Sequence, residues 1–464
     1  MAKRSKKSAS DAAAGDALHP RSPTPPSRHL ANPVFAQPEP TEDPSIFKIK
    51  HPSDGAAYKA IDDLNKQHQL KPMSFPPPRG GAEPQLTLLQ VFGGNKGAID
   101  TITKNGQIVF HSTGDCGSTR GPKTQNEVTD KMIGDFNESR PIEVPQFCLL
   151  LGDIVYSFGE TEYYYDQFYE PYRNYHAPVL AAAGNHDGMV SPLAHAKSLG
   201  AYLRNFCADP ALGFTVTPEA GGLSRTAQIQ PGVFFTFDAP FTRILVFYSN
   251  TLEDPGVIAD QNIGQSQIQF LRSALQRVKR ENFQGALLFA HHHPCYAIGG
   301  QHSSSTEMRQ QMDAVCAEVG VWPHAVLAGH AHSYQRFTRH RPDKTEIPYI
   351  ICGNGGHNVQ KLQAQGGVAL RAPQIVSSSG NEQVVFENYD DTDYGYLRVV
   401  VDAQQLRVEY HLASDGAGVK APDDSVTIDL STRKRTVYQP NDLGFGGRAK
   451  AVQAKVAGPS RGKK

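Results

Sequence analysis

The chain has 464 residues, of which 39% are hydrophobic, and its 46 basic and 46 acidic residues balance to a formal net charge of zero. This balance gives no bulk electrostatic argument for binding nucleic acid or a membrane surface, although both ends of the chain are basic. No run approaches the roughly 18 consecutive apolar residues of a membrane span. No apolar segment follows the basic start, as a secretory signal would require. We therefore expect a cytoplasmic chain whose six scattered cysteines are free thiols.

Composition divides the chain into four parts. Residues 1–44 are rich in Ala, Ser, Pro and charge, so they are predicted to be a disordered tail. Residues 45–85 are predicted to be a linker with one possible helix, stopped by a proline run. Residues 86–431 alternate apolar strand and amphipathic helix patterns and are long enough to bury a large core. Residues 432–464 are expected to form a second polar, basic tail.

Within the predicted domain, the first apolar runs are typical of strands, and Asn105-Gly106 is the turn signal of a β-hairpin. A helix is predicted over 127–141, ending at a proline, and another begins at Ser191, a helix cap followed by proline. The Tyr-rich segment 163–175 either packs into the core or forms an aromatic rim over a site. Apolar spacing predicts an amphipathic helix over 266–280. The alternation as a whole favours an α/β fold with largely parallel sheets and some antiparallel hairpins.

Five segments share one pattern, in which an apolar run is followed by a turn with ligand-type side chains. They are Gly114-Asp115-Cys116-Gly117, Gly152-Asp153-Ile154-Val155-Tyr156, Gly184-Asn185-His186-Asp187, Ala290-His291-His292-His293-Pro294 and Gly329-His330-Ala331-His332. Apolar runs that end in such turns indicate buried parallel strands, and ligands bind beyond the carboxyl ends of these strands. We therefore expect the five turns to open on the same rim of one sheet.

The side chains in these turns suit a particular kind of metal site. Carboxylate, imidazole and amide oxygen ligands fit Zn, Fe or Mn better than metals that prefer thiolates. The set exceeds what one tetrahedral site needs and a carboxylate can bridge, so two metal ions roughly 3.5–4 Å apart are expected. Such a pair polarises a phosphoryl oxygen, lowers the pKa of bound water and stabilises charge on the leaving oxygen.

The ordered set GDxG, GDxxY, GNHD, apolar-x-x-His and GHxH, over about residues 110–340, resembles the calcineurin-like metallophosphoesterases. The Tyr of GDxxY makes the chain more similar to their purple acid phosphatase branch. The resemblance implies an αββα sandwich of mixed, largely parallel sheets with disordered tails. It also implies metal ligation by Asp115, Asp153, Tyr156, Asn185, His292, His330 and His332, with Asp153 bridging both ions.

The implied cofactor is iron(III), bound by Tyr156 as a phenolate, together with a second ion of Fe, Zn or Mn. The alternative is that Tyr156 is a packed aromatic residue and that both ions are divalent. His186 and His302 are the implied catalytic residues, which contact the substrate phosphate or protonate the leaving group. His302 lies one residue further from His292 than the family spacing. Asp187, His291 and Arg120 are expected to orient ligands or to contact substrate, although Arg120 also fits a solvated loop.

The function expected from these residues is hydrolysis of phosphate monoesters on a phosphorylated small molecule, by water activated at a dinuclear metal centre. A phosphodiesterase of the same superfamily, acting on a cyclic nucleotide or a phospholipid head group, is an alternative, because the motifs do not separate the two. A non-catalytic scaffold on the same fold would be expected to have lost ligands, and none is lost here. A nucleic-acid binder would rest only on the basic ends, so no nucleic-acid partner is expected.

Overall fold

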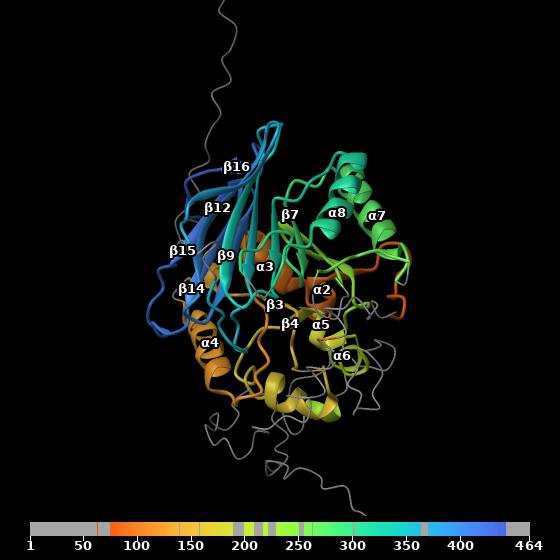
Figure 1. Cartoon of the computed structure of the whole chain (residues 1–464). Coiled ribbons are helices and arrows are strands. Elements are labelled where there is room, and N and C mark those ends of the chain that lie inside the picture. Colours follow the sequence, from red (N-terminus) through yellow and green to blue (C-terminus); the bar gives the residue numbers. More distant parts are fainter. Residues whose placement is uncertain are drawn as a thin grey trace, which may run out of the picture.

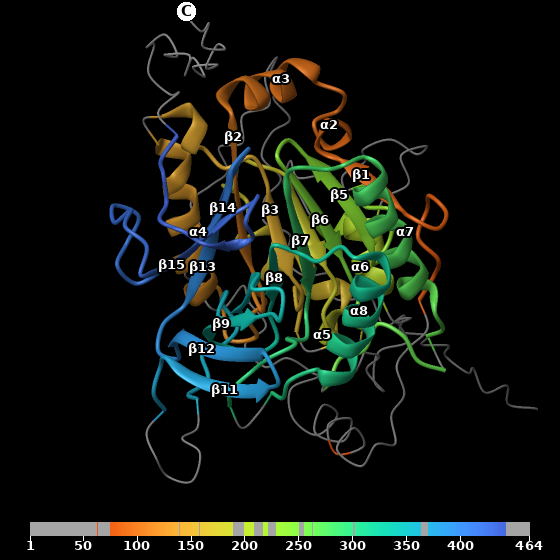
Figure 2. The same cartoon turned by 90° about the horizontal axis from the view of Figure 1, so that it is seen from above.

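The computed structural model describes residues 63, 75–138, 140–156, 158–188, 199–207, 217–220, 229–249, 255–261, 263–299, 302–362 and 370–441. The predicted tail 1–44, the residues after 441 and the helix start at Ser191 lie outside this part of the chain. Two mixed β-sheets pack face to face, with helices outside them (Figures 1 and 2). The expected α/β sandwich is therefore confirmed.

One sheet has nine strands and the other has seven. In spatial order, the larger sheet contains β1 (Gln85–Thr87), β5 (Phe235–Ala239), β6 (Thr242–Val246), β7 (Ala286–His291), β8 (Ala325–Ala328), β10 (Glu346–Cys352), β9 (Tyr334–His340), β12 (Glu382–Asp390) and β11 (Gln374–Ser379). The smaller contains β16 (Lys434–Arg435), β15 (Asp424–Asp429), β14 (Gln405–Leu412), β13 (Gly395–Asp402), β2 (Gln107–Thr113), β3 (Cys148–Leu151) and β4 (Val179–Ala182). Parallel pairing joins β6, β7, β8 and β10 in one sheet and β2, β3 and β4 in the other. Antiparallel pairing prevails among the remaining strands, more than the sequence predicts.

Helices cover both outer faces of the sandwich. The α-helices are α2 (Leu88–Val91), α3 (Lys96–Asn105), α4 (Lys123–Gly134), α5 (Asn185–Gly188), α6 (Gly200–Phe206), α7 (Ser266–Arg280) and α8 (Thr306–Val319). Short 3₁₀ turns span Asp135–Asn137, Pro141–Glu143, Thr161–Tyr163 and Pro218–Ala220, and a π-helix spans Tyr165–Tyr169. Figure 2 shows α4 beyond the seven-stranded sheet, and α7 and α8 beyond the nine-stranded sheet. Among the described residues, no helix has the length and apolar character needed to cross a membrane.

The strands under the site are buried on both faces, as parallel strands between helical layers must be. Leu149 and Leu151 of β3 belong to the core between the sheets, whereas Cys148 and Leu150 belong to the core beneath the helices. This alternation follows from the two-residue repeat of a strand. Such burial holds the carboxyl ends of these strands rigidly, which is what positions the turns described below.

The predicted hairpin at the start of the domain is wrong. Residues 88–105 form α2 and α3, and Asn105-Gly106 ends a helix. Gly106 has a φ of 73° and its N–H donates to Thr103 O, a common helix-terminating arrangement. Asn95 caps the other end of α3 by accepting a hydrogen bond from Ala98 N. Asn-Gly serves both a tight hairpin turn and a helix end, so the dipeptide alone did not distinguish them.

The helix predicted over 127–141 is instead α4, which begins at Lys123 and ends at Gly134, before the 3₁₀ turn Asp135–Asn137. Two other predicted elements agree with the structure. The helix over 266–280 is α7, and the Tyr-rich segment packs into the core, with Tyr164, Phe168 and Tyr169 all buried. The residues that flank the predicted domain 86–431 also pack against it. Arg79 donates to Cys207 O and Gln230 O, and Arg433 donates to Trp322 O and Pro323 O.

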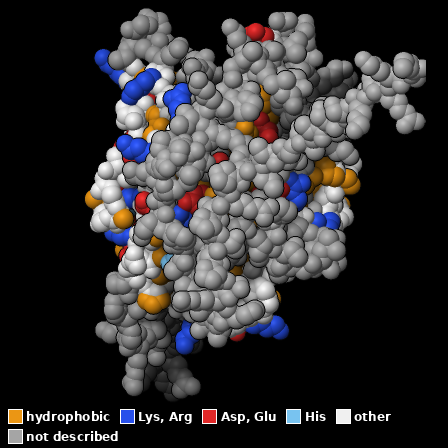
Figure 3. Space-filling view, turned by 90° about the horizontal axis from the view of Figure 1, so that it is seen from below, with side chains coloured by type: hydrophobic (Ala, Val, Ile, Leu, Met, Phe, Trp, Pro, Cys, Tyr) orange, Lys and Arg blue, Asp and Glu red, His pale blue; other side chains and the backbone are white. Residues whose placement is uncertain are grey.

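The outer surface of the described part carries both signs of charge. On the face shown in Figure 3, acidic and basic side chains both appear among the described residues, with hydrophobic ones between them. The six cysteines are free thiols, as expected, and five of them are buried.

Candidate metal centre

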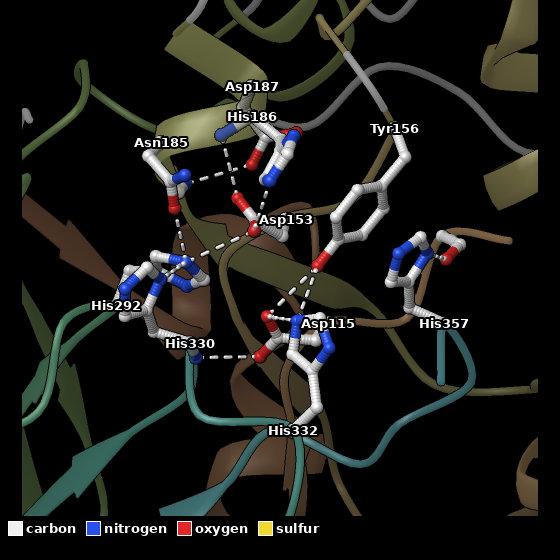
Figure 4. Close-up of polar contacts among 12 residues, drawn as sticks. Asp115, Asp153, Tyr156, Asn185, His186, Asp187, His292, His330, His332 and His357 are labelled. Carbon is white, nitrogen blue, oxygen red and sulfur yellow. Dashed lines mark hydrogen bonds and ion pairs between the residues drawn. The ribbon is translucent and has the colours of Figure 1, made fainter. Parts of the chain in front are cut away.

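The five predicted turns meet at one end of the sandwich, but they come from both sheets. β2, β3 and β4 of the smaller sheet lead into Asp115, into Asp153 and Tyr156, and into Asn185. β7 and β8 of the larger sheet lead into the turns that hold His292 and His330. The expected common rim is present, although the turns were expected on a single sheet. The site therefore lies where two facing sheets end together (Figure 4).

Asp115, Tyr156 and His332 form one group of ligand-type side chains, named here the Tyr156 cluster. Tyr156 Oη donates to Asp115 Oδ1 at 3.0 Å and lies 3.3 Å from His332 Nε2. His332 Nε2 is 3.2 Å from Asp115 Oδ1. His332 Nδ1 donates to the side-chain oxygen of Asn358, which leaves the Nε2 lone pair directed at the cluster.

Asn185, His292 and His330 form a second group, named here the His292 cluster. His292 Nε2 lies 2.9 Å from Asn185 Oδ1 and 3.3 Å from His330 Nδ1. Asp153 joins this group, because its Oδ2 is 3.2 Å from His292 Nε2. Ligand atoms of Asp153, His292 and His330 all lie within 4.8 Å of one another. Burial raises the pKa of the Tyr156 phenol, and the carboxylates of Asp115 and Asp153 raise it further, so Asp153 acts on both clusters.

The chemistry of these donors fits metal ions. His292 Nδ1 donates to Leu151 O at 2.8 Å, so the neutral ring presents a lone pair at Nε2. That lone pair faces the oxygen atoms of Asn185 and Asp153, which are acceptors too. Burial lowers the pKa of His292, but Asp153 and Asp115 raise it to about 9. The carboxylates therefore favour a positive charge at Nε2, and a bound cation would supply such a charge among these acceptors.

The backbone at the ligand positions is strained. Asp115, Asp153 and His330 have φ values of 56°, 54° and 68°, a left-handed region that side chains other than glycine seldom adopt. Such strain persists only where the surrounding structure enforces it, and it is concentrated at functional sites. The neighbouring glycines leave no room for larger residues. A Cβ on Gly329 would lie 2.7 Å from Asp115 Oδ2, and one on Gly184 would collide with the Asp153 carboxylate.

Two of the GNHD residues lie against Asp153. The backbone N–H of His186 donates to Asp153 Oδ1 at 2.9 Å, and its ring centroid is 4.3 Å from that of Tyr156. Asp187 accepts hydrogen bonds from Ile154 N at 3.0 Å and Gly184 N at 2.9 Å, so it fastens the β3 turn to the β4 turn. Burial and the Asp153 carboxylate raise the pKa of Asp187 to about 7. Asp187 thus links two turns that carry candidate ligands, and its role in orienting them stays a prediction.

The remaining predicted site residues are placed differently. The ring centroid of His302 is 4.2 Å from that of His330, and neither ring nitrogen has a hydrogen-bond partner among the described residues. Burial lowers the pKa of His302 to about 3. His291 is fully buried in β7, where its Nε2 lies 3.8 Å from Cys295 Sγ, so the structure does not bring it among the ligands. Arg120 is exposed, and its backbone N–H donates to Ser118 Oγ.

Sequence reasoning missed two residues at the centre, His357 and Asn358. They follow β10, which pairs in parallel with β8 and ends on the same rim. The imidazole of His357 stacks on Tyr156, and Asn358 orients His332. The signal was present in the sequence, because the apolar run 347–352 ends in Gly353-Asn354-Gly355-Gly356-His357-Asn358, the same pattern as the other five turns.

Comparison with known proteins agrees with this geometry. Residues 111–334 match the family model described as calcineurin-like phosphoesterase. The chain carries a calcineurin-like phosphoesterase domain. The matched residues begin in β2 and end at the start of β9, so they include all five predicted turns but stop before His357.

Two curated relatives of this phosphoesterase domain come from Arabidopsis thaliana. Probable purple acid phosphatase 20 is 25% identical over 258 residues, which cover 54% of this chain and 51% of the relative. Purple acid phosphatase 23 is 28% identical over 200 residues, which cover 42% and 37%. The chain therefore spans about half or less of the length of these relatives. Among solved structures, purple acid phosphatase PPD1 from yellow lupin seeds matches with a TM-score of 0.47 and 17% identity, covering 70% of this chain and 54% of that one.

Proposed function

We propose that the phosphoesterase domain is a dinuclear-metal hydrolase of phosphate monoesters. The observation that carries the proposal is the pair of ligand clusters on either side of Asp153, a carboxylate that can bridge two cations. The similarity to purple acid phosphatases supports the same activity. The substrate is a phosphorylated small molecule of unspecified leaving group, and the cytoplasmic location stays a prediction from sequence.

In this proposal the Tyr156 cluster holds iron(III), with Tyr156 as a phenolate, and the His292 cluster holds a divalent Fe, Zn or Mn. Phenolate, carboxylate and imidazole suit the harder ion, and imidazoles with an amide oxygen suit the divalent one. Asp153 belongs to both. When bound, the two ions would polarise the phosphate and lower the pKa of water.

The residues of the chain have separate roles in the reaction. A water molecule loses a proton to solvent and its oxygen forms a bond to phosphorus, while the bond from phosphorus to the ester oxygen breaks. His186 donates a proton to the departing oxygen, since its ring lies beside Asp153 and Tyr156 at the edge of both clusters. His302 donates a hydrogen bond to a phosphate oxygen, which gives one of its buried ring nitrogens a partner.

The proposal is tested by comparing hydrolysis of p-nitrophenyl phosphate and bis-p-nitrophenyl phosphate between pH 5 and 8, with the metal content of the same sample measured. We expect two metal ions per chain and faster turnover of the monoester. Preference for the diester would instead identify a phosphodiesterase. Two bound ions with turnover of neither compound would indicate a narrow substrate range, and absence of bound metal would contradict the proposal.

Replacing His186 by Ala should lower kcat by about 10²–10⁴-fold, the usual contribution of a general acid, while metal content stays near two ions per chain. Asp153→Asn should instead lose both metal and turnover, because it removes the shared carboxylate. The matched control is His176→Ala, since His176 is exposed and its ring lies tilted against Phe136, with a centroid distance of 5.4 Å. Full activity of the His186 variant would contradict the assigned role.

A further inference from the structure

We propose that His357 is a positioning residue for Tyr156, holding the phenol ring at the angle from which its oxygen reaches Asp115 and His332. The inference rests on the proposed function, because it concerns how the Tyr156 cluster holds its metal. It concerns a residue outside the five motifs and outside the matched part of the chain.

The first observation is the packing of the two rings. The centroids of His357 and Tyr156 are 3.6 Å apart and the ring planes differ by 7°, so the rings stack face to face. Figure 4 shows Tyr156 between His186 and His357. In a parallel stack the imidazole lone pair stays in the plane of its own ring and does not point at the phenol oxygen. His357 therefore acts on Tyr156 through the ring face, and not as a further ligand of the same cation.

The second observation is how His357 itself is held. Its backbone N–H donates to Asp115 O at 2.9 Å, and its Nδ1 donates to Gly117 O at 3.0 Å. Both acceptors belong to the first ligand turn. Thr124 Oγ1 donates to Gly356 O, and Gly355 N donates to Gly114 O at 3.0 Å. The segment after β10 is thus fastened along the first turn, and these hydrogen bonds hold the imidazole against Tyr156.

These contacts bear on metal binding in a definite way. The Tyr156 side chain rotates about two bonds. Its oxygen therefore points steadily at Asp115 and His332 only if neighbouring residues fix the orientation of the ring. The ring of His332 lies 5.2 Å from His357 at 77°, so the same imidazole also limits the space for His332. Loss of the stack would free the phenol ring. Removal of such supporting contacts lowers metal affinity by about 10–100-fold in other metal sites.

Two substitutions separate the stack from the hydrogen bond. His357→Phe keeps an aromatic ring against Tyr156 but cannot donate to Gly117 O, whereas His357→Asn keeps a donor and loses the stack. The full chain is loaded with iron, and two quantities are measured: the visible absorption of the iron–phenolate pair, and iron affinity by competition with a chelator. The matched controls are His176→Phe and His176→Asn at an exposed histidine. Circular dichroism confirms that each variant is folded.

We expect His357→Asn to move the absorption maximum and to lower iron affinity by about tenfold or more. For His357→Phe, both the absorption maximum and the iron affinity should stay close to those of the parent chain. Two results would overturn the inference. One is a His357→Asn variant with the absorption maximum and iron affinity of the parent chain, and the other is a His357→Phe variant whose iron affinity falls as much as that of His357→Asn. Absence of a visible band in the parent chain would contradict iron(III)–phenolate ligation in the proposed function. The chelator competition, repeated with Zn²⁺ or Mn²⁺, would then still decide the role of His357.

Discussion

At the scale of single residues, the ligand positions combine backbone strain with tight packing. Three side chains of the centre sit on left-handed backbone, which costs of order 1–3 kcal/mol at each residue. Glycines beside them let the turns of the two sheets approach within contact distance. The conformations that direct Asp115, Asp153 and His330 are therefore fixed by folding, so metal ions would meet ligands that are already arranged.

Gly184→Ala should disrupt the centre, because its new Cβ would collide with the Asp153 carboxylate and backbone nitrogen. Asp153 lies in a tightly packed turn and cannot move away without a large cost in free energy. Metal content and turnover should therefore both fall sharply. Metal analysis and a phosphatase assay measure this. Gly97→Ala is the control, since the nearest atom to its Cβ would be 3.5 Å away in an exposed helix. A Gly184→Ala variant with full metal content would show that the turn can relax.

At the scale of elements, the strand ends and the helix α7 were predicted well, whereas α2, α3 and the exposed hairpin β11–β12 were not. The five turns were predictable because each follows an apolar run buried on both faces, and hydrophobic patterns report such strands directly. The hairpin β11–β12 was missed because most of β11 is exposed and its Ser377, Ser378 and Ser379 show no apolar alternation. His357 was not predicted because the family resemblance rests on five motifs that end at His332, and the turn after β10 lies beyond them.

The correction at α3 gives an element-scale prediction. Asn95→Ala should destabilise the chain by about 1 kcal/mol, because it removes the side-chain acceptor of Ala98 N at the start of the helix. Urea unfolding measures the loss. Asn95→Asp keeps an acceptor and should remain within a few tenths of 1 kcal/mol of the parent chain. Equal stability of the Ala variant would mean that solvent replaces the cap without cost.

At the scale of the whole molecule, the C-terminal boundary of the domain can be tested. The predicted boundary at residue 431 falls within a packed region, since Arg433 donates to two carbonyls near β8 and β16 pairs with β15. Gln439 N also donates to Gln405 Oε1 at 3.1 Å. These contacts fasten the last described residues across both sheets.

A chain ending at residue 441 should therefore unfold at the same temperature as the full chain. A chain ending at 431 should lose on the order of 3 kcal/mol of its free energy of unfolding, because two part-buried hydrogen bonds from a charged group disappear. Thermal unfolding of the three lengths, with metal analysis of each, makes the comparison. Identical unfolding of the two shorter chains would support the boundary at 431.

Because the ligands are divided between two sheets, the distances between them depend on how the two sheets are packed against each other. Asp115, Tyr156 and Asn185 move with one layer, whereas His292 and His330 move with the other. The spacing between the ions would then depend on residues such as Phe147 and Phe237, which interlock between the layers at a centroid distance of 4.9 Å. A change of side-chain volume at these positions would shift the ligands of one sheet relative to those of the other. Catalysis would thus constrain the choice of side chains in the core between the sheets, although these residues do not contact substrate.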